Sequence, residues 1–203
     1  MAEISTKEKL LNAALELFSK KGYSATSVDE IAEAVGMTGP SIYKYFKGKE
    51  DLLKGLTERA ESEYKSKMQM NPDSMIRIHN KEKLKAFSLA QIRFTMFDEN
   101  IVRMRRMHTI EQFRNENMSR LASLHQYYNI LGLYGKIFSG LMEHGIMEKN
   151  DPEFMALEYI SPVTMLLQLG DREPDIREEL MTKIEKHIDF FIDKYIKEQG
   201  DKQ

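Results

Sequence analysis

The chain has 203 residues, of which 41% are hydrophobic and 31% are charged, and its formal net charge is −2. These values are typical of a globular protein with enough apolar residues for a core, and they exclude an overall electrostatic attraction to nucleic acid. The absence of cysteine excludes disulfides, thiolate metal sites and cysteine nucleophiles.

The sequence lacks the segments that are typical of membrane and secreted proteins. Its most apolar C-terminal stretch, residues 159–169, is interrupted by Ser161, Pro162, Thr164 and Gln168, so a membrane span is excluded. The first residues, MAEISTKEKLL, do not have the basic region and apolar region of a signal peptide. We therefore expect a cytoplasmic protein without a membrane partner.

Almost every segment has the apolar period of an α-helix, and none alternates like a strand, so an all-α protein is predicted. The first helix begins at a capping box, Ser5 to Glu8, and ends at Gly22. A second capping box, Ser27 to Glu30, opens the next helix. The core-facing stripe of the first helix comprises Leu10, Leu11, Ala14, Leu17 and Phe18.

Residues 27–46, SVDEIAEAVGMTGPSIYKYF, have the pattern of a helix-turn-helix. The first helix can close at Gly36, where a left-handed residue without a Cβ is not strained. The second can open at Thr38, whose hydroxyl can accept an exposed backbone N–H. Pro40 falls in the first turn, where a missing N–H is harmless.

The second helix of this motif is unusually polar and aromatic. Ile42 and Phe46 are four residues apart, so they are expected to dock it against the core. Lys47 and Lys49 add cations after it, although anions and cations balance over residues 1–50. Hydroxyls, phenols and cations suit a DNA groove and its phosphates, which makes DNA binding the leading hypothesis and a solvated lysine cluster the alternative. The side chains that point outward are Ser41, Tyr43, Lys44 and Tyr45.

Helical segments continue to the C-terminus. A boundary is predicted at residues 71–80, which begin with Asn-Pro-Asp. The two last helices open at Asp-Pro-Glu and Glu-Pro-Asp, patterns typical of a helix start. The helices beyond the boundary are expected near 81–97, 101–113, 117–144, 152–169 and 174–197.

Together these features resemble the TetR/AcrR family of bacterial transcriptional regulators. The resemblance covers residues 10–53, in which the skeleton "F…GY..TS…IA…G…..IY.YF..KE.L" is complete. It implies an all-α fold of about nine helices and an Ω-shaped homodimer. Residues 1–50 would be the helix-turn-helix DNA-binding domain, and residues 51–203 a larger effector-binding and dimerisation domain.

The resemblance also implies contacts with the DNA backbone. Tyr43 and Lys49 match the usual phosphate contacts of the family. Ser27 and Thr38 match capping positions that also touch phosphates. Tyr45 stands where the family most often has histidine, and its phenol can donate to a phosphate but cannot gain charge.

The family's base-reading positions correspond to Gly39, Pro40, Ser41 and Lys44. Pro40 departs from the common small polar residue and has no N–H to donate, which leaves an apolar contact such as one with a thymine methyl. Two structural alternatives stay open: Tyr43 could pack against the first helix, and Lys44 could be a solvated surface lysine.

No enzymatic or metal-binding motif is found in the sequence. The five histidines are scattered, and His108 with Glu111 has the wrong order for a carboxylate-bridged metal site. No Gly-rich phosphate loop, G-x-S-x-G or zinc motif occurs. We therefore expect no catalysis, no metal and no cofactor.

The C-terminal half carries many methionine and aromatic residues, most of which are expected in the core. Methionine adapts to irregular shapes, so a hydrophobic effector pocket is the alternative for several of them. Pro162 should kink its helix by removing the hydrogen bond to the carbonyl of Glu158. Two interpretations of this kink stay open: a curved packing helix, and an opening that makes space for a ligand. The candidate effector-binding residues are Met104, His108, Tyr128, Met155 and Tyr159.

The helices near 152–169 and 174–197 are expected to form a four-helix bundle with the same pair of a second subunit, using the stripe of Phe191, Ile192 and Tyr195. We interpret the chain as a repressor that grips a palindromic operator with two recognition helices roughly 34–36 Å apart and is released by a small, hydrophobic effector. The alternative is a DNA-bound scaffold of the same fold that recruits a protein partner, and an activator is a third candidate.

Overall fold

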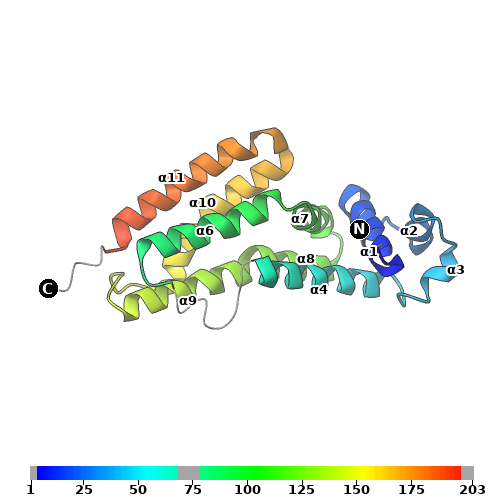
Figure 1. Cartoon of the computed structure of the whole chain (residues 1–203), viewed down its shortest axis with the longest axis horizontal. Coiled ribbons are helices and arrows are strands. Elements are labelled where there is room, and N and C mark those ends of the chain that lie inside the picture. The colour runs from blue at the N-terminus through cyan, green and yellow to red at the C-terminus, as the bar shows by residue number, and fades with distance from the viewer. Residues whose placement is uncertain (1–3, 68–77, 198–203) are drawn as a thin grey trace. The chain divides into compact units, whose positions relative to one another are not determined.

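The computed structural model describes residues 4–67 and 78–197, and the regular elements in these ranges are helices (Figure 1). The expected all-α fold is confirmed. Of the predicted boundary at 71–80, residues 71–77 lie outside the described ranges. No helix within those ranges is long and apolar enough to cross a membrane.

The described residues cluster into two compact units. Unit 1 joins the residues up to Tyr64 to Glu99–Ala122, whereas unit 2 joins Lys65–Asp98 to the residues from Ser123 onward. The chain therefore returns to unit 1 before it completes unit 2. This division does not coincide with the functional boundary expected at residue 50, which stays a prediction.

Unit 1 contains the predicted helix-turn-helix and two helices from the middle of the chain. The first helix packs against the second and against a helix that begins at Glu99. Their common core contains Phe18 and Ile42 together with Met104 and Met107. The helix that begins at Glu99 therefore supplies part of the core on which the helix-turn-helix packs. In chain order the elements of unit 1 are α1 (Thr6–Lys21), α2 (Val28–Ala34), α3 (Gly39–Ile42), most of α4 (Lys49–Lys67), α7 (Glu99–Glu111) and α8 (Glu116–Ser123).

The helix caps form as predicted at the N-terminal end of unit 1. Ser5 Oγ accepts the N–H of Glu8 at 3.2 Å, which is one of the two bonds of the predicted capping box. The capping box of Ser27 is complete in both directions. Gly22 has a φ of 92° and Gly36 a φ of 74°, conformations that side chains with a Cβ rarely adopt. These caps set where α1 ends and α2 begins.

Unit 2 is a helical bundle in which α10 packs against α6, α9 and α11, and α10 and α11 run side by side (Figure 1). Burial of their facing stripes gives this unit its core. Its elements are α6 (Lys81–Phe97), the π-helical turn η1 (Leu124–Tyr128), α9 (Asn129–Glu143), α10 (Pro152–Arg172), the 3-10 turn η2 (Pro174–Ile176) and α11 (Arg177–Tyr195).

An aromatic cluster fills the centre of unit 2. The ring centroid of Tyr159 lies 5.0 Å from that of Tyr134, 5.4 Å from Phe138 and 4.7 Å from Phe191. Tilted and edge-to-face arrangements at these distances are favourable beyond simple burial. The hydroxyl of Tyr159 donates to Ser88 Oγ at 2.8 Å, and burial raises the pKa of that phenol. Tyr159 is thus a neutral, hydrogen-bonded core residue.

One expectation about α11 needs correction, whereas the kink expected at Pro162 in α10 stays a prediction. Phe191 and Ile192 are only 3% and 4% exposed because they pack inside the protomer, so the prediction that they face a second subunit is wrong. The exposed apolar side chain beside them is Phe190. The helix α10 continues through Pro162 as one element, with Ser161 Oγ donating to the carbonyl of Leu157 at 2.6 Å.

Candidate nucleic-acid interface

The turn of the helix-turn-helix is closed by backbone hydrogen bonds around Gly36. Met37 N donates to the carbonyl of Ala32 at 2.9 Å, which ends α2. Thr38 has the extended backbone of an N-cap, but its hydroxyl does not cap α3 as predicted. It instead lies 2.9 Å from Ser41 Oγ, so the two hydroxyls bond to each other at the surface.

The recognition helix is shorter than predicted. Only Gly39–Ile42 are α-helical, and residues 43–45 form turns. Aromatic residues favour the helix less than Ala or Leu, and Tyr43 and Tyr45 are both aromatic. Phe46 N still donates to the carbonyl of Ile42 at 3.0 Å, so helical spacing continues for one more turn.

This segment separates its side chains by polarity. Ile42 is 0% exposed and Phe46 3%, as predicted for core residues. Tyr43 is 61% exposed and Tyr45 41%, so neither is buried against α1. Lys44 is also exposed. A buried apolar pair therefore presents two phenols and an ammonium to the outside, a set that can donate hydrogen bonds to an anionic partner.

Gly39 lies beside the side chain of Asp29 on α2. A Cβ at this position would overlap Oδ1 of Asp29. The next residue, Pro40, is exposed in the first turn of α3. The two predicted base-reading positions at this end of α3 thus carry no side-chain hydrogen-bond donor or acceptor.

Hydrogen bonds also fix the N-terminus of α2. Ser27 N donates to Glu30 Oε2 at 2.8 Å, and Ser27 Oγ accepts from Glu30 N at 3.2 Å. The ammonium of Lys21 bonds to the carboxylate of Glu30. The Lys21 bond, followed by those from Ser27, lowers the pKa of Glu30 from 4.5 to about 2, so the carboxylate is ionised at neutral pH.

Lys49 has partners that the sequence did not suggest. Its ammonium donates to the carbonyls of Tyr23 at 2.8 Å, Ser24 at 3.3 Å and Thr26 at 2.9 Å. It also lies 4.6 Å from the ring centroid of Tyr23. These contacts connect Lys49 to the loop between α1 and α2, and the phosphate contact that the resemblance implies for Lys49 stays a prediction.

The sequence did not indicate that Glu111 contacts the loop before the helix-turn-helix. It is 1% exposed at the end of α7, and its carboxylate accepts from Ser24 N at 3.2 Å and from Ser24 Oγ at 2.5 Å. The two residues are 87 positions apart, so no local pattern pairs them. The one available signal was Gly22, whose lack of a Cβ makes room for the carboxylate.

The predicted effector residues are divided between the two units. Met104 and His108 are buried on α7 in unit 1, at 7% and 3% exposure. Met155 and Tyr159 are buried one turn apart on α10 in unit 2. Tyr128 is 62% exposed on η1. Only the α10 pair shares one packed cluster.

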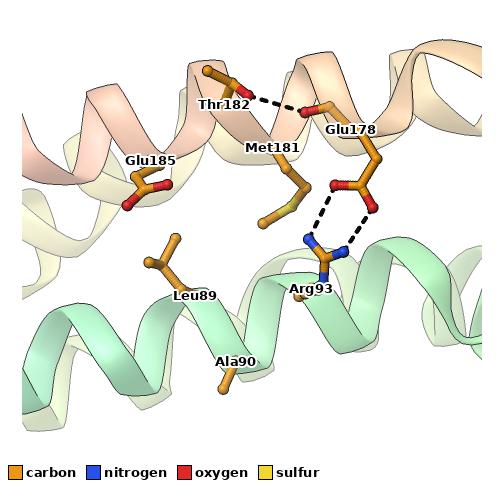
Figure 2. Close-up of a pocket in the computed structure, with 7 residues that line it drawn as sticks. All are labelled: Leu89, Ala90, Arg93, Glu178, Met181, Thr182 and Glu185. Carbon is orange, nitrogen blue, oxygen red and sulfur yellow. Dashed lines mark hydrogen bonds and ion pairs between the residues drawn. The ribbon is translucent and has the colours of Figure 1, made fainter.

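Unit 2 also has a surface groove of about 290 Å³ between α6 and α11 (Figure 2). One wall carries the guanidinium of Arg93, which bonds to both carboxylate oxygens of Glu178 at 3.1 and 2.6 Å. Met181 and Leu89 supply apolar lining. None of the predicted effector residues lines this groove, and its strongest charges are already paired.

The described ranges contain no cluster of metal-binding side chains. No group of three or more His, Asp or Glu side chains there could hold a metal ion. Glu111, which the sequence places three residues after His108, instead accepts hydrogen bonds from Ser24.

Residues 10–56 match the family described as "Bacterial regulatory proteins, tetR family". The HTH-type transcriptional regulator AcrR of Shigella flexneri is 42% identical over 79 residues, which cover 36% of this chain and 37% of AcrR. The fatty acid metabolism regulator protein of Bacillus subtilis is 26% identical over 138 residues, covering 68% of this chain and 66% of that protein. The aligned stretches thus span less than two thirds of both relatives, and both are named as regulators rather than enzymes.

Solved structures of similar fold extend over nearly the whole chain. SmeT, the repressor of the Stenotrophomonas maltophilia multidrug efflux pump SmeDEF, aligns with a TM-score of 0.70 and 20% identity, covering 96% of this chain and 92% of SmeT. A SmeT–triclosan complex aligns with a TM-score of 0.73 and 19% identity, covering 96% and 93%. At this identity the likeness shows a common fold.

Proposed function

We propose that the chain is a cytoplasmic, sequence-specific DNA-binding repressor of transcription, because residues 10–56 match the tetR family of bacterial regulatory proteins. The observation that carries this proposal is the polarity of the segment around α3. Ile42 and Phe46 anchor it in the core, while Tyr43, Lys44 and Tyr45 are exposed. Such a segment can enter a major groove while Ile42 and Phe46 stay packed in the core.

Its contacts with DNA divide into two kinds. Backbone contacts come from the hydroxyl and phenol groups of Ser27, Thr38, Tyr43 and Tyr45, which can donate to phosphate oxygens. Base contacts come from the N-terminal part of the recognition segment, because this end of such a helix approaches base edges. The base-contacting set comprises Gly39, Pro40, Ser41 and Lys44.

Selection of bound duplexes from a random pool tests this function. The wild-type protein should enrich a palindrome whose half-sites are about one helical turn apart, roughly 34–36 Å. The matched variant Tyr43→Ala with Lys44→Ala keeps the buried pair beneath it, and it should enrich no sequence. Enrichment of the same palindrome by the variant would remove this segment from the interface.

A homodimer built on α10 and α11 would supply the two recognition segments. Support comes from exposed apolar side chains on these helices: Phe154 is 52% exposed, Met165 62% and Phe190 66%. Exposed large apolar groups on neighbouring helices are costly in water and are commonly covered by a partner. Two-fold pairing of the same surface is the commonest way to cover them.

We propose that a small hydrophobic effector binds in unit 2 and thereby releases the protein from its operator. The SmeT–triclosan complex offers a precedent for such a ligand on a similar fold. Met155 and Tyr159 lie in the core of unit 2, and Tyr159 donates to Ser88 on α6. Gln91, three residues after Ser88 on the same helix, is 6% exposed and has no hydrogen-bond partner for Oε1 in the described ranges. An apolar molecule with one hydrogen-bond donor would match these groups. Met104, His108 and Tyr128 stay predictions.

Triclosan can serve as the probe for this effector site. Titration into the complex of the protein with its enriched duplex should release the DNA, and Gln91→Leu should weaken that release while leaving DNA affinity without triclosan unchanged. Release that is equal in wild type and variant would separate Gln91 from the site. A complex that resists triclosan at saturating concentration would exclude this class of effector.

A further inference from the structure

The loop between α1 and α2 connects the end of α1 directly to the first cap of the DNA-binding motif. Residues 22–26 form this loop, and Ser27 follows. Within it, Thr26 N donates to the carbonyl of Tyr23 at 3.3 Å, and Thr26 Oγ1 donates to the carbonyl of Gly22 at 2.8 Å. These bonds do not satisfy every polar group of the loop, so the remaining ones need partners from other elements.

Lys49 supplies hydrogen-bond donors for the backbone carbonyls of this loop. An ammonium has three N–H donors and no acceptor. Here all three have a carbonyl within reach, those of Tyr23, Ser24 and Thr26, and the ring of Tyr23 lies beneath the charge. These contacts hold the ammonium against the loop within unit 1, so this lysine stabilises the loop.

Glu111 supplies hydrogen-bond acceptors for the N–H and hydroxyl donors of this loop. A carboxylate is an acceptor only, and here its two oxygens take the N–H and the hydroxyl of Ser24. The group is almost fully buried, where an unpaired charge would be costly, so the two hydrogen bonds are needed to hold it there. Gly22 borders the carboxylate so closely that a Cβ would overlap Oε1.

We propose that Lys49 and Glu111 are positioning residues for DNA binding, which hold the loop 22–26 and through it the N-terminus of α2 where the operator backbone meets that helix. The proposal rests on the proposed function. It gives Lys49 a role other than phosphate contact, and it assigns to α7, through Glu111, a direct part in shaping the DNA-binding surface.

The salt dependence of binding separates positioning from phosphate contact for Lys49. A lysine that neutralises a phosphate releases a counterion, and its loss lowers the log–log salt slope by about one unit. Lys49→Ala should instead weaken binding to the enriched duplex about tenfold, close to the weight of one charge-assisted hydrogen bond, with an unchanged slope. Lys49→Arg, which can still donate to the carbonyls, should recover most of the affinity. A slope reduced by about one unit would overturn the role given to Lys49.

The sign of the charge gives an equally sharp test for Glu111. Loss of an acidic group should strengthen binding to DNA if only Coulomb forces act. Glu111→Ala should weaken it about tenfold because Ser24 loses both acceptors. Glu111→Gln should recover most of the affinity, since its amide can accept from Ser24 N and donate to Ser24 Oγ. The exposed Glu116 on α8 provides the matched control, and Glu116→Ala should leave affinity unchanged or slightly higher.

All variants are compared at a temperature at which thermal unfolding shows them to be folded. If Glu111→Ala does not fold, Ser24→Ala removes one of the two hydrogen bonds and should weaken binding severalfold. Unchanged or stronger binding by Glu111→Ala or Ser24→Ala, or no recovery in Glu111→Gln, would overturn the proposal. A wild type without any sequence preference would overturn the proposed function and this proposal together, whereas a wild type with a preference that all variants share would overturn this proposal alone.

Discussion

At the scale of single residues, the proposed recognition of DNA depends on side chains that alternate between core and solvent. Ile42 and Phe46 are almost fully buried, whereas Tyr43 and Tyr45, which lie between them in the sequence, are exposed. Buried anchors hold the backbone in one place, so the exposed groups need little ordering when DNA arrives. The surface can therefore be altered without loss of the fold, which makes single substitutions informative.

Lys44 and Tyr43 should have different effects on binding. Lys44→Ala should relax the preference at one base pair in each half-site, at a cost of about 1–3 kcal/mol for the preferred base. Tyr43→Phe removes one phenol donor and should weaken binding to all sequences alike, because phosphate contacts carry no sequence information. Measured affinities for the enriched duplex and for single-base variants distinguish the two. Equal losses on specific and random duplexes for Lys44→Ala would count against base reading.

At the scale of elements, α2 depends on an ionised Glu30. The pKa of this group is lowered from 4.5 to about 2 by Lys21 and Ser27. A lowered pKa means that the folded state favours the charged form, so the stabilisation is fully present above pH 4.5 and is lost as the pH falls toward 2. The capping box and the ion pair of α2 weaken together in that range.

Hydrogen exchange of the α2 amides should report this loss. Between pH 4.5 and 2, protection at the N-terminus of α2 should fall more than intrinsic exchange rates explain. In Glu30→Gln the amide cannot titrate, so protection should be lower at neutral pH and independent of pH over this range. Identical pH profiles for wild type and Glu30→Gln would contradict the link between this carboxylate and the helix cap.

The elements were predictable where their causes are local. The cap at Ser5, the capping box at Ser27 and the turn at Gly36 depend on residues at most a few positions apart. The structure has the box at Ser27 and the turn, and at Ser5 it has one of the two bonds of the predicted box. The length of α3 was overestimated, because apolar spacing continues to Phe46 although the aromatic residues before it form turns. The side of α11 that faces the core depends on α9 and α10, which the stripe of α11 alone does not specify.

The candidate site was predictable only in its exposed part. Tyr43, Lys44 and Tyr45 are turned outward as their spacing from Ile42 indicates. The partners of Lys49 and Glu111 depend instead on tertiary contacts 23 to 87 positions apart. Hydrogen bonds of this kind follow from the packing of α4 and α7 in unit 1, so no motif within either helix reveals them.

At the scale of the whole molecule, the expected function requires two copies of the chain. A stable interface commonly buries about 1,200–2,000 Å² with a few large apolar side chains near its centre. Phe190 on α11 and Met165 on α10 are exposed apolar groups of this kind. Because Phe191 and Ile192 are used within the protomer, we propose that the interface depends on the opposite side of these helices.

Charge placed on this side should separate the subunits. Phe190→Glu should raise the dimer dissociation constant about tenfold or more, because two carboxylates would meet across the two-fold axis without partners. Phe113 is 91% exposed in unit 1, and Phe113→Glu is the matched control that should leave assembly unchanged. Sedimentation velocity over a concentration series measures both. An unaltered dimer in Phe190→Glu would place the interface elsewhere.

The most direct test of the account is the ratio of two dissociation constants, measured at physiological salt for the enriched duplex and for a scrambled duplex of the same composition. Specific DNA-binding proteins of this kind reach ratios of about 10³ or more. We predict such a ratio for the wild-type chain, and a collapse of that ratio in the double variant Tyr43→Ala with Lys44→Ala. A ratio near one for the wild type would contradict sequence-specific binding, and with it the assignment of the surface around α3 as the DNA interface.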